Sequence, residues 1–313
     1  MRMGINYIDK KCVILVDVGA RGGIDPRWRF FKDQLELILF DADPTAQVIS
    51  DNELGFSYTI IPIALGKKIG DVSLNICKGP DMSSIYEPNY CILDQWEKRE
   101  RFNIIKKIMV PLSTLDSQLA QKNIPRIDFL KIDTQGSELD ILEGAISALT
   151  DVIGLEIEVE FIEMYLDQPL FSDIDRFLKK HGFSLYDLHT RTWNYKLVKK
   201  SGSQRKNSKL IWGDALYFKD PEEILSKKDS NLLKRAVICY LAYGYDCIAW
   251  YCVKNAADYG IITPNEYQNI TDLMQEWEKK QNRIFIKLLN YFPKPFISSL
   301  LKLLNCKSLG NYK

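Results

Sequence analysis

The stretch Val13-Ile-Leu-Val-Asp-Val-Gly-Ala-Arg-Gly-Gly-Ile-Asp25 decides the fold. Its first four residues are apolar and mostly β-branched, which is typical of a strand that is buried on both faces of a parallel sheet. Gly19, Gly22 and Gly23 follow, and they allow positive φ angles and a close approach of a ligand to the backbone. Asp25 precedes a proline, a pattern typical of a helix N-cap. The stretch therefore predicts the opening of an α/β domain that binds a nucleoside.

The spacing of these glycines separates two classes of nucleoside cofactor. A dinucleotide fold has G-x-G-x-x-G, with a pyrophosphate on the helix N-terminus, whereas Asp17-Val-Gly19-Ala-Arg-Gly22-Gly23 lacks the first G-x-G. The segment is more similar to the D-x-G opening of methyltransferases that use S-adenosylmethionine. That cofactor carries a sulfonium cation, so an acidic residue near the loop is electrostatically favourable. A tight turn without a ligand is the alternative.

The composition is that of a soluble globular protein. A chain of 313 residues can hold one ordinary domain with an appendage, or two small domains. The net charge of +1 gives no overall attraction to nucleic acid, and the basic run 199–209 is interpreted as a solvated loop. Seven cysteines without a C-x-x-C pair indicate neither a disulfide framework nor a zinc site, and they suit a reducing cytoplasm. No apolar run is long enough to span a bilayer.

Apolar runs and turn signals predict strands that alternate with helices over the first two thirds of the chain. Strands are expected at 13–16, 37–41, 58–62, 72–77, 110–112, 127–132, 152–161, 183–188 and 210–218, of which 72–77 and 110–112 are short edge strands. Helices are expected after the glycine loop and at 44–54, 113–121, 137–149 and 172–181. Since two strands in succession end the series, we expect a doubly wound, mostly parallel sheet with a terminal antiparallel hairpin.

From about residue 221 onward only helical spacing is found, which predicts helices at 231–243, 247–259, 264–280 and 284–304. The chain is therefore divided into an α/β domain at 1–220 and an all-helical C-terminal region at 221–313.

The most specific block of the sequence is Lys131-Ile-Asp-Thr-Gln-Gly-Ser-Glu-Leu-Asp-Ile-Leu-Glu-Gly-Ala145. With Phe40-Asp-Ala-Asp-Pro44, Ser113-Thr-Leu-Asp116 and Glu156-Ile-Glu-Val-Glu160, it resembles the FkbM family of S-adenosylmethionine-dependent O-methyltransferases. The resemblance covers roughly residues 13–220 and implies a Rossmann-like, class I methyltransferase fold. The family phrase K-I-D-x-Q-G-x-E-x-x-x-L-x-G-A is matched at Lys131, Asp133, Gln135, Gly136, Glu138, Leu142, Gly144 and Ala145.

The chain departs from the family in two motifs of the expected cofactor site. The family more often shows G-A-N-x-G after its first strand and E-P-D-P after its second, where this chain has Arg21 and Asp41. A carboxylate at Asp41, at the end of the second strand, can hold both ribose hydroxyls, and a turn-forming aspartate is the alternative. The resemblance also implies a loop over the cofactor that contains an S-S pair. The expected cofactor-binding residues are Asp17, which shapes the loop, with Gly19, Gly22, Asp41, Ser83, Ser84 and Asp133.

Methyl transfer to a hydroxyl is an in-line displacement, so the protein must align the acceptor oxygen and help to remove its proton. Asp133 follows the fourth strand and could face both methyl and acceptor, with capping of the next helix near Ser137 as the alternative. Glu156, Glu158 and Glu160 share one face of a strand, where three unpaired carboxylates would be costly if buried. A solvated strand end, with only Glu156 or Glu158 functional, is favoured over a three-carboxylate metal site. The expected catalytic residues are Asp133, Glu158 and His189, and no metal is expected.

The predicted activity is transfer of a methyl group from S-adenosylmethionine to a hydroxyl. The resemblance implies a sugar of a surface polysaccharide or lipid-linked glycan as acceptor, or a secondary metabolite. Trp193 and Tyr195 could stack on a sugar ring, which favours the glycan, although packing within a hairpin is an equal alternative. Two alternatives come from other functional classes: a nicotinamide oxidoreductase, and a non-catalytic carbohydrate-binding or assembly protein.

The C-terminal segment 279–313 contains eight Lys or Arg and no Asp or Glu, interleaved with apolar residues. Such a basic amphipathic segment can lie on an anionic membrane surface. A packed terminal helix is the alternative. The packed helix is favoured, and we expect a cytoplasmic protein; peripheral contact with the inner face of the membrane is the second possibility and would fit a lipid-linked acceptor.

Overall fold

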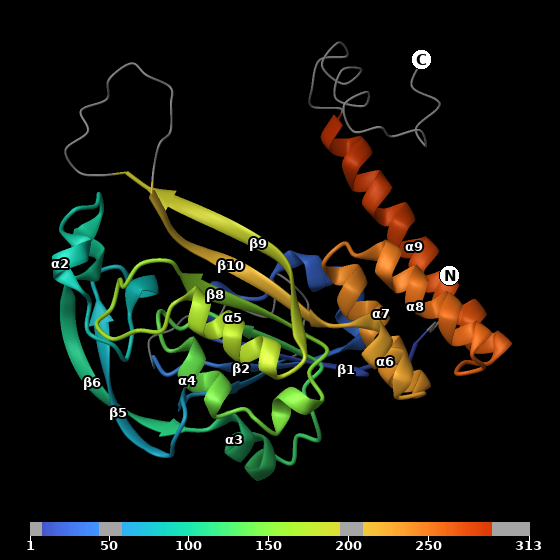
Figure 1. Ribbon diagram of the computed structural model, residues 1–313, viewed down its shortest axis with the longest axis horizontal. Coiled ribbons are helices and arrows are strands. Elements are labelled where there is room, and N and C mark those ends of the chain that lie inside the picture. The colour runs from blue at the N-terminus through green and yellow to red at the C-terminus, as the bar shows by residue number, and fades with distance from the viewer. Residues whose placement is uncertain (1–7, 44–57, 195–208, 290–313) are drawn as a thin grey trace.

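The computed structural model describes residues 8–43, 58–194 and 209–289, and its centre is a seven-stranded sheet (Figure 1). The strand order is β3-β2-β1-β7-β8-β10-β9. The first five strands of this order are parallel, and β10 runs antiparallel to both neighbours. The predicted doubly wound sheet with a terminal antiparallel hairpin is therefore confirmed. The strands are β1 (Val13–Val18), β2 (Leu35–Phe40), β3 (Tyr58–Ile61), β7 (Phe129–Ile132), β8 (Gly154–Glu160), β9 (Phe183–Trp193) and β10 (Lys209–Lys219).

Strand β1 shows why the sheet is covered on both faces. All six of its residues are buried, and successive side chains point to opposite sides. Val13 and Leu15 belong to one core cluster, whereas Ile14 and Val16 belong to another. The continuous apolar run of this strand is therefore divided between two cores, as a central parallel strand requires.

One face is covered by three helices from the α/β part of the chain. These helices are α3 (Leu115–Lys122), α4 (Glu138–Glu143) and α5 (Phe171–Lys180), with the short helix η5 (Ala148–Thr150) beside them. Their apolar residues pack with Ile14 and Val16 in a single cluster. Figure 1 shows α4 and α5 in front of the sheet.

The other face is covered by the 3-10 helix η2 (Pro26–Gln34) and by the C-terminal helices. These are α6 (Pro221–Ser226), α7 (Ser230–Ala242), α8 (Asp246–Asp258) and α9 (Pro264–Leu289), which gather at one side of the sheet in Figure 1. They share one core cluster with β1, β2, β7 and β10. The helical region therefore completes the core of the sheet.

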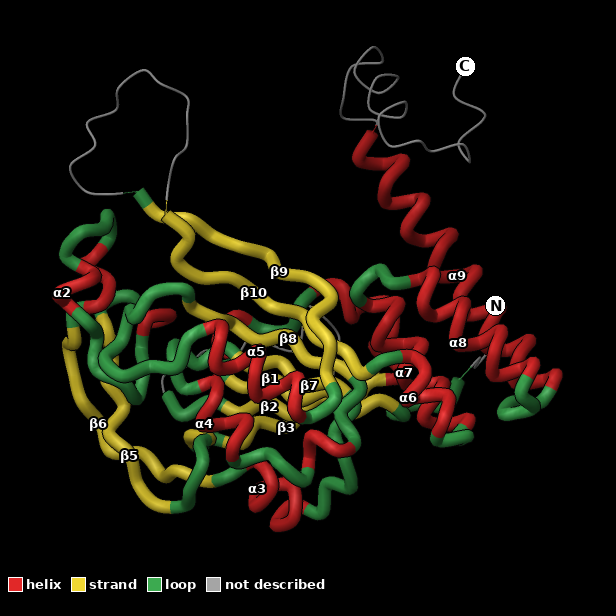
Figure 2. The backbone as a smooth tube through the Cα atoms, in the orientation of Figure 1, coloured by secondary structure: helices red, strands yellow, loops and turns green. Residues whose placement is uncertain are grey.

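A second sheet has the order β4-β6-β5, with β4 (Ala64–Leu65), β5 (Gly70–Cys77) and β6 (Ile104–Ser113). Figure 2 shows β5 and β6 lying apart from the main sheet. The segments 72–77 and 110–112 were expected as short edge strands; instead they pair with each other, and β6 has ten residues. Leu74 and Val110 are buried together in a small cluster of their own, which favours this pairing. The chain segment that connects β5 to β6 contains η3 (Pro80–Met82), α2 (Tyr90–Leu93) and η4 (Arg99–Phe102).

Several other element predictions need correction. The expected helix after the glycine loop consists of two 3-10 segments, η1 (Ala20–Gly22) and η2, although Asp25 caps η2 as predicted by accepting from the Arg27 amide at 2.8 Å. Thr114 rather than Ser113 caps α3, because Ser113 is still part of β6. The helix expected at 137–149 ends at Glu143. Helix α9 continues to residue 289, and the rest of the expected helix 284–304, like the helix 44–54, lies outside the described residues.

Among residues 8–43, 58–194 and 209–289, no helix is long and apolar enough to cross a membrane.

Candidate active site

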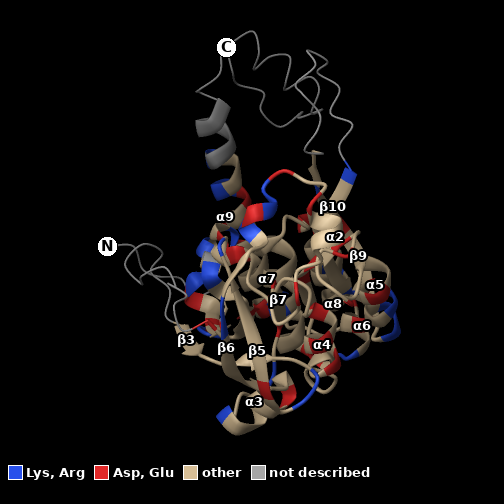
Figure 3. Cartoon of the chain, turned by 90° about the vertical axis from the view of Figure 1, so that its left-hand side faces the viewer, with Lys and Arg blue, Asp and Glu red and all other residues tan. Residues whose placement is uncertain are grey.

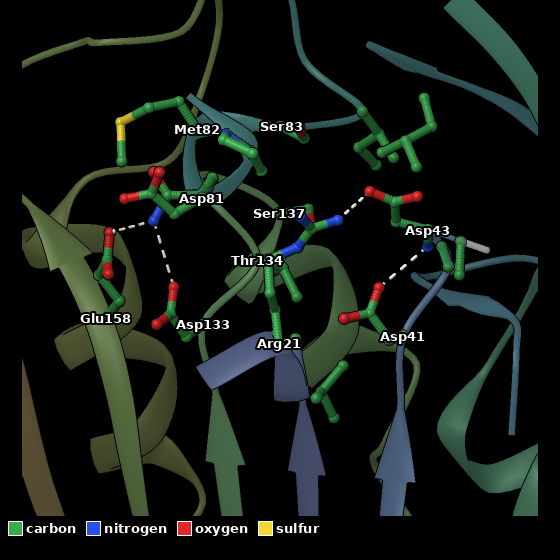
Figure 4. A pocket seen from close by; sticks show the side chains of 18 of the residues that line it. Arg21, Asp41, Asp43, Asp81, Met82, Ser83, Asp133, Thr134, Ser137 and Glu158 are labelled. Carbon is green, nitrogen blue, oxygen red and sulfur yellow. Dashed lines mark hydrogen bonds and ion pairs between the residues drawn. The ribbon is translucent and has the colours of Figure 1, made fainter. Parts of the chain in front are cut away.

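A cavity of about 530 Å³ lies at the carboxyl ends of the parallel strands (Figure 4). Pockets in this size range hold small-molecule ligands, and the crevice beyond the strand ends is where open α/β sheets bind them. The cavity extends across several strands, so the strand order defines its two ends. Asp41, after β2, marks one end. Trp212 of β10 and Trp193 of β9 mark the other.

The glycine loop brings three strand ends together at the floor of the cavity. Gly19 has a φ of +84°, and its amide donates to the carbonyl of Phe40 at 2.9 Å. A Cβ atom at this position would lie 1.8 Å from the carbonyl oxygen of Asp133. Only glycine tolerates both the backbone conformation and this close approach. Gly22 ends the η1 turn that follows.

At the β2 end, Asp41 and Asp43 line the cavity together with Arg21. The Asp41 carboxylate accepts from the amide of Asp43 at 2.9 Å, so Asp41 both forms a turn and faces the cavity. Burial raises the pKa of Asp41. Arg21, the residue that departs from the family pattern, forms an ion pair with Asp43, and Figure 4 shows its side chain reaching up between Asp41 and Asp133.

The loop after β7 connects the two predicted acidic residues through an amide that sequence reasoning did not single out as functional. Gln135 Nε2 donates to Asp133 Oδ1 at 3.2 Å and to Glu158 Oε1 at 2.7 Å. The Gln135 side-chain oxygen accepts from the hydroxyl of Tyr165 at 3.2 Å, which fixes the orientation of the amide. Gln135 has a φ of +60°, a left-handed conformation that is uncommon for a side-chain-bearing residue. Its only sequence signal is its place in the matched family phrase.

Glu138 holds this loop in shape. Its carboxylate accepts from the Thr134 amide at 2.8 Å, from the Thr134 hydroxyl at 3.0 Å and from the Gly136 amide at 2.9 Å. The alternative role of Asp133, capping the next helix, is therefore not observed; Asp133 lines the cavity instead. Burial raises the pKa of Glu138 to about 7.

The three glutamates of β8 have three different surroundings. Glu156 forms an ion pair with Arg27 at 3.0 Å. Glu158 lines the cavity, and burial together with the charges of Asp133 and Glu160 raises its pKa well above the usual range. Glu160 is fully buried, and burial, followed by the charge of Glu138, likewise raises its pKa. The predicted cost of three carboxylates on one face is therefore reduced by a cation at Glu156 and by the cavity at Glu158. In the described part of the chain, no group of three or more His, Cys, Asp or Glu could hold a metal ion.

Asp17, Ser84 and His189, which were expected as site residues, lie outside the lining of the cavity. Asp17 is buried beneath it and forms an ion pair with Lys131 at 3.3 Å. Ser84 is buried and donates to the carbonyl of Gln135 at 2.7 Å, so it supports the loop from behind. His189 is exposed on β9, the last strand of the sheet, opposite Asp214. Ser83 does line the cavity, and its hydroxyl accepts from the Cys77 amide at 3.1 Å.

The opposite end of the cavity has aromatic and basic walls. Trp193, Trp212 and Met164 line it together with Lys98 and Arg101. Both tryptophans are partly buried and pack against an apolar cluster that includes α2 and the segment after β8. Tyr195, the other aromatic residue expected here, lies outside the described residues.

Comparison with known proteins identifies the family of this fold and cavity. The profile of the methyltransferase FkbM domain matches residues 17–185, more than half of the chain. The chain belongs to the FkbM methyltransferase family. It is an S-adenosylmethionine-dependent methyltransferase. The family match therefore favours the predicted methyltransferase over the alternative of a nicotinamide oxidoreductase.

One relative of this FkbM protein is the 2-O-methyltransferase NoeI of Sinorhizobium fredii (strain NBRC 101917 / NGR234). It is 25% identical over 187 residues, which cover 56% of this chain and 74% of NoeI. Among solved structures, a methyltransferase from Pyrococcus horikoshii is 13% identical, with a TM-score of 0.30 and coverage of 69% of this chain and 79% of that one. A SAM-dependent methyltransferase from Methanosarcina mazei is 8% identical, with a TM-score of 0.29 and coverage of 68% and 95%.

The β2 half of the cavity in this FkbM protein fits S-adenosylmethionine. Asp41 offers a carboxylate where a ribose would be held, and the backbone of Gly19 permits close approach. The walls on this side are apolar and suit an adenine ring; they include Ile63, Leu65, Leu74 and Ile85.

Proposed function

We propose that the protein transfers the methyl group of S-adenosylmethionine to a hydroxyl oxygen of a sugar in a surface polysaccharide or lipid-linked glycan. The observation that carries this proposal is the continuous cavity from Asp41 to Trp193 and Trp212, with Asp133 and Glu158 between its ends. The bound cofactor would supply an activated methyl group on a sulfonium centre. The residues of this chain must position the acceptor hydroxyl and accept its proton.

On the cofactor side, Asp41 would bind the ribose hydroxyls, and the backbone at Gly19 would lie against the amino acid part. Asp133 and Glu158 come next in the strand order, so they would lie beside the reacting atoms. The carboxyl groups of Asp133 and Glu158 favour a ligand that carries a positive charge at this part of the cavity.

Glu158 is the group best suited to remove the acceptor proton. A carboxylate with a raised pKa is a stronger base than an ordinary one, and burial raises the pKa of Glu158. Asp133 and Glu158 are held by the same Gln135 amide, so their carboxylates are fixed relative to each other. We assign proton removal to Glu158 and orientation of the acceptor hydroxyl to Asp133.

Two observations support a sugar hydroxyl as acceptor. NoeI bears the name of a 2-O-methyltransferase, so a relative of this chain methylates oxygen. The acceptor end is lined by Trp193 and Trp212, and aromatic rings commonly provide large contact surfaces for ring-shaped ligands. Methylation of a secondary metabolite is the alternative that an acceptor screen would detect.

Peripheral contact with an anionic membrane through residues 279–313 is part of this proposal. The described beginning of this segment, at the end of α9, exposes Lys279, Lys280 and Arg283, and Figure 3 shows basic residues along that helix. Each basic residue near an anionic surface contributes about 1 kcal/mol to binding. Sedimentation with anionic and neutral liposomes at low salt tests the contact, and equal sedimentation with both would refute it.

Isothermal titration with S-adenosylmethionine and S-adenosylhomocysteine tests the cofactor assignment. We expect both ligands to bind, Asp41→Ala to abolish binding, and Asp133→Ala to retain it while losing methyl transfer. Asp71→Ala, which changes an exposed carboxylate of β5 outside the cavity, is the matched control. Absence of binding by the parent protein at millimolar ligand would refute the proposed function.

A further inference from the structure

The acceptor end of the cavity contains a basic residue whose charge is not compensated. Three basic residues of the described chain line the cavity, namely Arg21, Lys98 and Arg101. Arg21 is paired with Asp43, and Arg101 is paired with Asp81. The side chain of Lys98 is exposed and makes no hydrogen bond or ion pair with the described residues. A cavity cation without an acidic partner is a ready partner for an anionic group of a ligand.

The backbone of Lys98 has an uncommon conformation. Lys98 has a φ of +67° and a ψ of 17°, in the left-handed region that a lysine rarely adopts. It precedes η4, and its carbonyl accepts from the amide of Arg101 at 3.0 Å. Strained backbone conformations of this kind are often found at ligand sites, where the surrounding structure maintains them.

Lys98 and Trp193 are brought together by a contact between their neighbours in the chain. The amide of Glu97 donates to the carbonyl of Asn194 at 3.3 Å, which ties the loop before η4 to the end of β9. Phe102 of η4 packs edge-on against the Trp193 ring, with centroids 5.9 Å apart. The uncompensated ammonium and the aromatic wall therefore belong to the same end of the cavity.

We propose that this end is a subsite for an anionic sugar, in which Trp193 and Trp212 contact the apolar face of the ring and Lys98 pairs with its negative group. The inference rests on the proposed function and specifies its acceptor: a sugar that carries a carboxylate or a phosphate. A neutral sugar would leave the ammonium of Lys98 paired only with solvent. Glu158 is on β8, which lies between β7 and the strands β10 and β9 that carry the two tryptophans. The hydroxyl to be methylated would be placed at the side of the subsite that faces Glu158.

The test is isothermal titration of protein saturated with S-adenosylhomocysteine, using matched sugar pairs. Each neutral methyl hexoside is compared with its uronate and with its 6-phosphate, so the two sources of negative charge are distinguished. We expect at least one anionic series to bind roughly tenfold more tightly than its neutral partners, the range of a charge-assisted hydrogen bond.

Variants assign the preference to the subsite. Lys98→Ala should remove the preference for the anionic member and keep the affinity for the neutral sugar, whereas Trp212→Ala should weaken both. Lys254→Ala, which changes an exposed lysine of α8, is the matched control and should behave as the parent protein. No preference for any anionic member, or a preference that survives Lys98→Ala, would overturn the inference.

Titration with S-adenosylhomocysteine alone is performed first on the same preparation. If this ligand does not bind, the proposed function fails. If it binds and the sugar pairs show no charge preference, only the anionic subsite is refuted.

Discussion

Gln135 Nε2 lies 2.7 Å from Glu158 Oε1, and the same nitrogen lies 3.2 Å from Asp133 Oδ1. One amide therefore positions the two acidic groups that the sequence identifies as catalytic candidates. An amide donates without adding charge, so it can hold two carboxylates together where a third acid would repel them. The left-handed backbone of Gln135 is the local cost of this arrangement.

We expect Gln135→Gly to reduce kcat by about 10²-fold, the effect of a misplaced reacting group, with little change in the affinity for S-adenosylmethionine. Glycine accepts the φ of +60°, so this variant removes the side chain without adding backbone strain. Steady-state kinetics and cofactor titration measure the two quantities. Gln121→Gly, in the last turn of α3, controls for the general effect of a glycine substitution. An unchanged kcat would show that Gln135 has no positioning role.

Gly19→Ala should abolish cofactor binding and destabilise the protein, because its Cβ would lie 1.8 Å from the carbonyl oxygen of Asp133. Gly244→Ala separates this clash from the cost of a positive φ. Gly244 has a φ of +80° but no atom within 4 Å of the added Cβ, so we expect it to lose only about 1–2 kcal/mol of stability. Urea unfolding and isothermal titration compare the variants; equal losses in both would mean that the contact with Asp133 is unimportant.

The main sheet was predictable because its signals are local. The apolar run of β1, the glycines after it and the alternating strands and helices each depend on a few consecutive residues. The second sheet was not predictable in the same way. The partners Val72 and Val110 are 38 positions apart, and exposed Lys106 and Lys107 interrupt the apolar pattern of β6.

The site was predictable where residues follow strand ends. Gly19, Asp41, Asp133 and Glu158 all line the cavity, since the carboxyl ends of parallel strands meet at one edge of a sheet. The contribution of Gln135 depends on a positive φ and on contacts with separate segments, which no local pattern encodes. Asp17, Ser84 and His189 have suitable chemistry and neighbouring positions, but the direction of each side chain takes it away from the cavity.

Asp17 predicts a specific dependence of stability on pH. Burial raises its pKa from 3.8 to about 6, and the attraction of Lys131 offsets only part of this. The folded state therefore binds this proton more tightly than the unfolded state does. The stability that Asp17 contributes is fully present below about pH 4 and is lost as the pH rises through about 6.

We expect Asp17→Asn to flatten the pH profile of the free energy of unfolding between pH 4 and 7, by at most about 3 kcal/mol. Asn removes the titration but also leaves Lys131 without its carboxylate, so the variant also differs from the parent protein by an offset that does not depend on the titration of Asp17. The slope, rather than the absolute value, is the diagnostic quantity. Urea unfolding at several pH values measures it, with Asp71→Asn as an exposed control. Parallel profiles for parent and Asp17→Asn would contradict the assignment.

The C-terminal helices are expected to be required for folding of the sheet. Tyr243, directly after α7, stacks on Phe129 of β7 with centroids 4.8 Å apart and an interplanar angle of 22°. The guanidinium carbon of Arg27 lies 4.3 Å from the centre of the same ring. Tyr243 thus joins the helical region to the centre of the sheet and to the helix after the glycine loop.

Tyr243→Ala should therefore lower the free energy of unfolding by at most about 3 kcal/mol, the low end of the cost of removing a fully buried aromatic side chain, because Tyr243 is partly buried. Tyr259→Ala, also directly after a helix but 68% exposed, should change it by less than about 0.5 kcal/mol. Both are measured by urea unfolding monitored by circular dichroism. Because Arg27 loses its aromatic partner and Glu156 a neighbouring hydroxyl, the glycine loop should also become less ordered, with weaker cofactor binding in Tyr243→Ala. Similar stabilities of the two variants would mean that the helical region folds independently of the sheet.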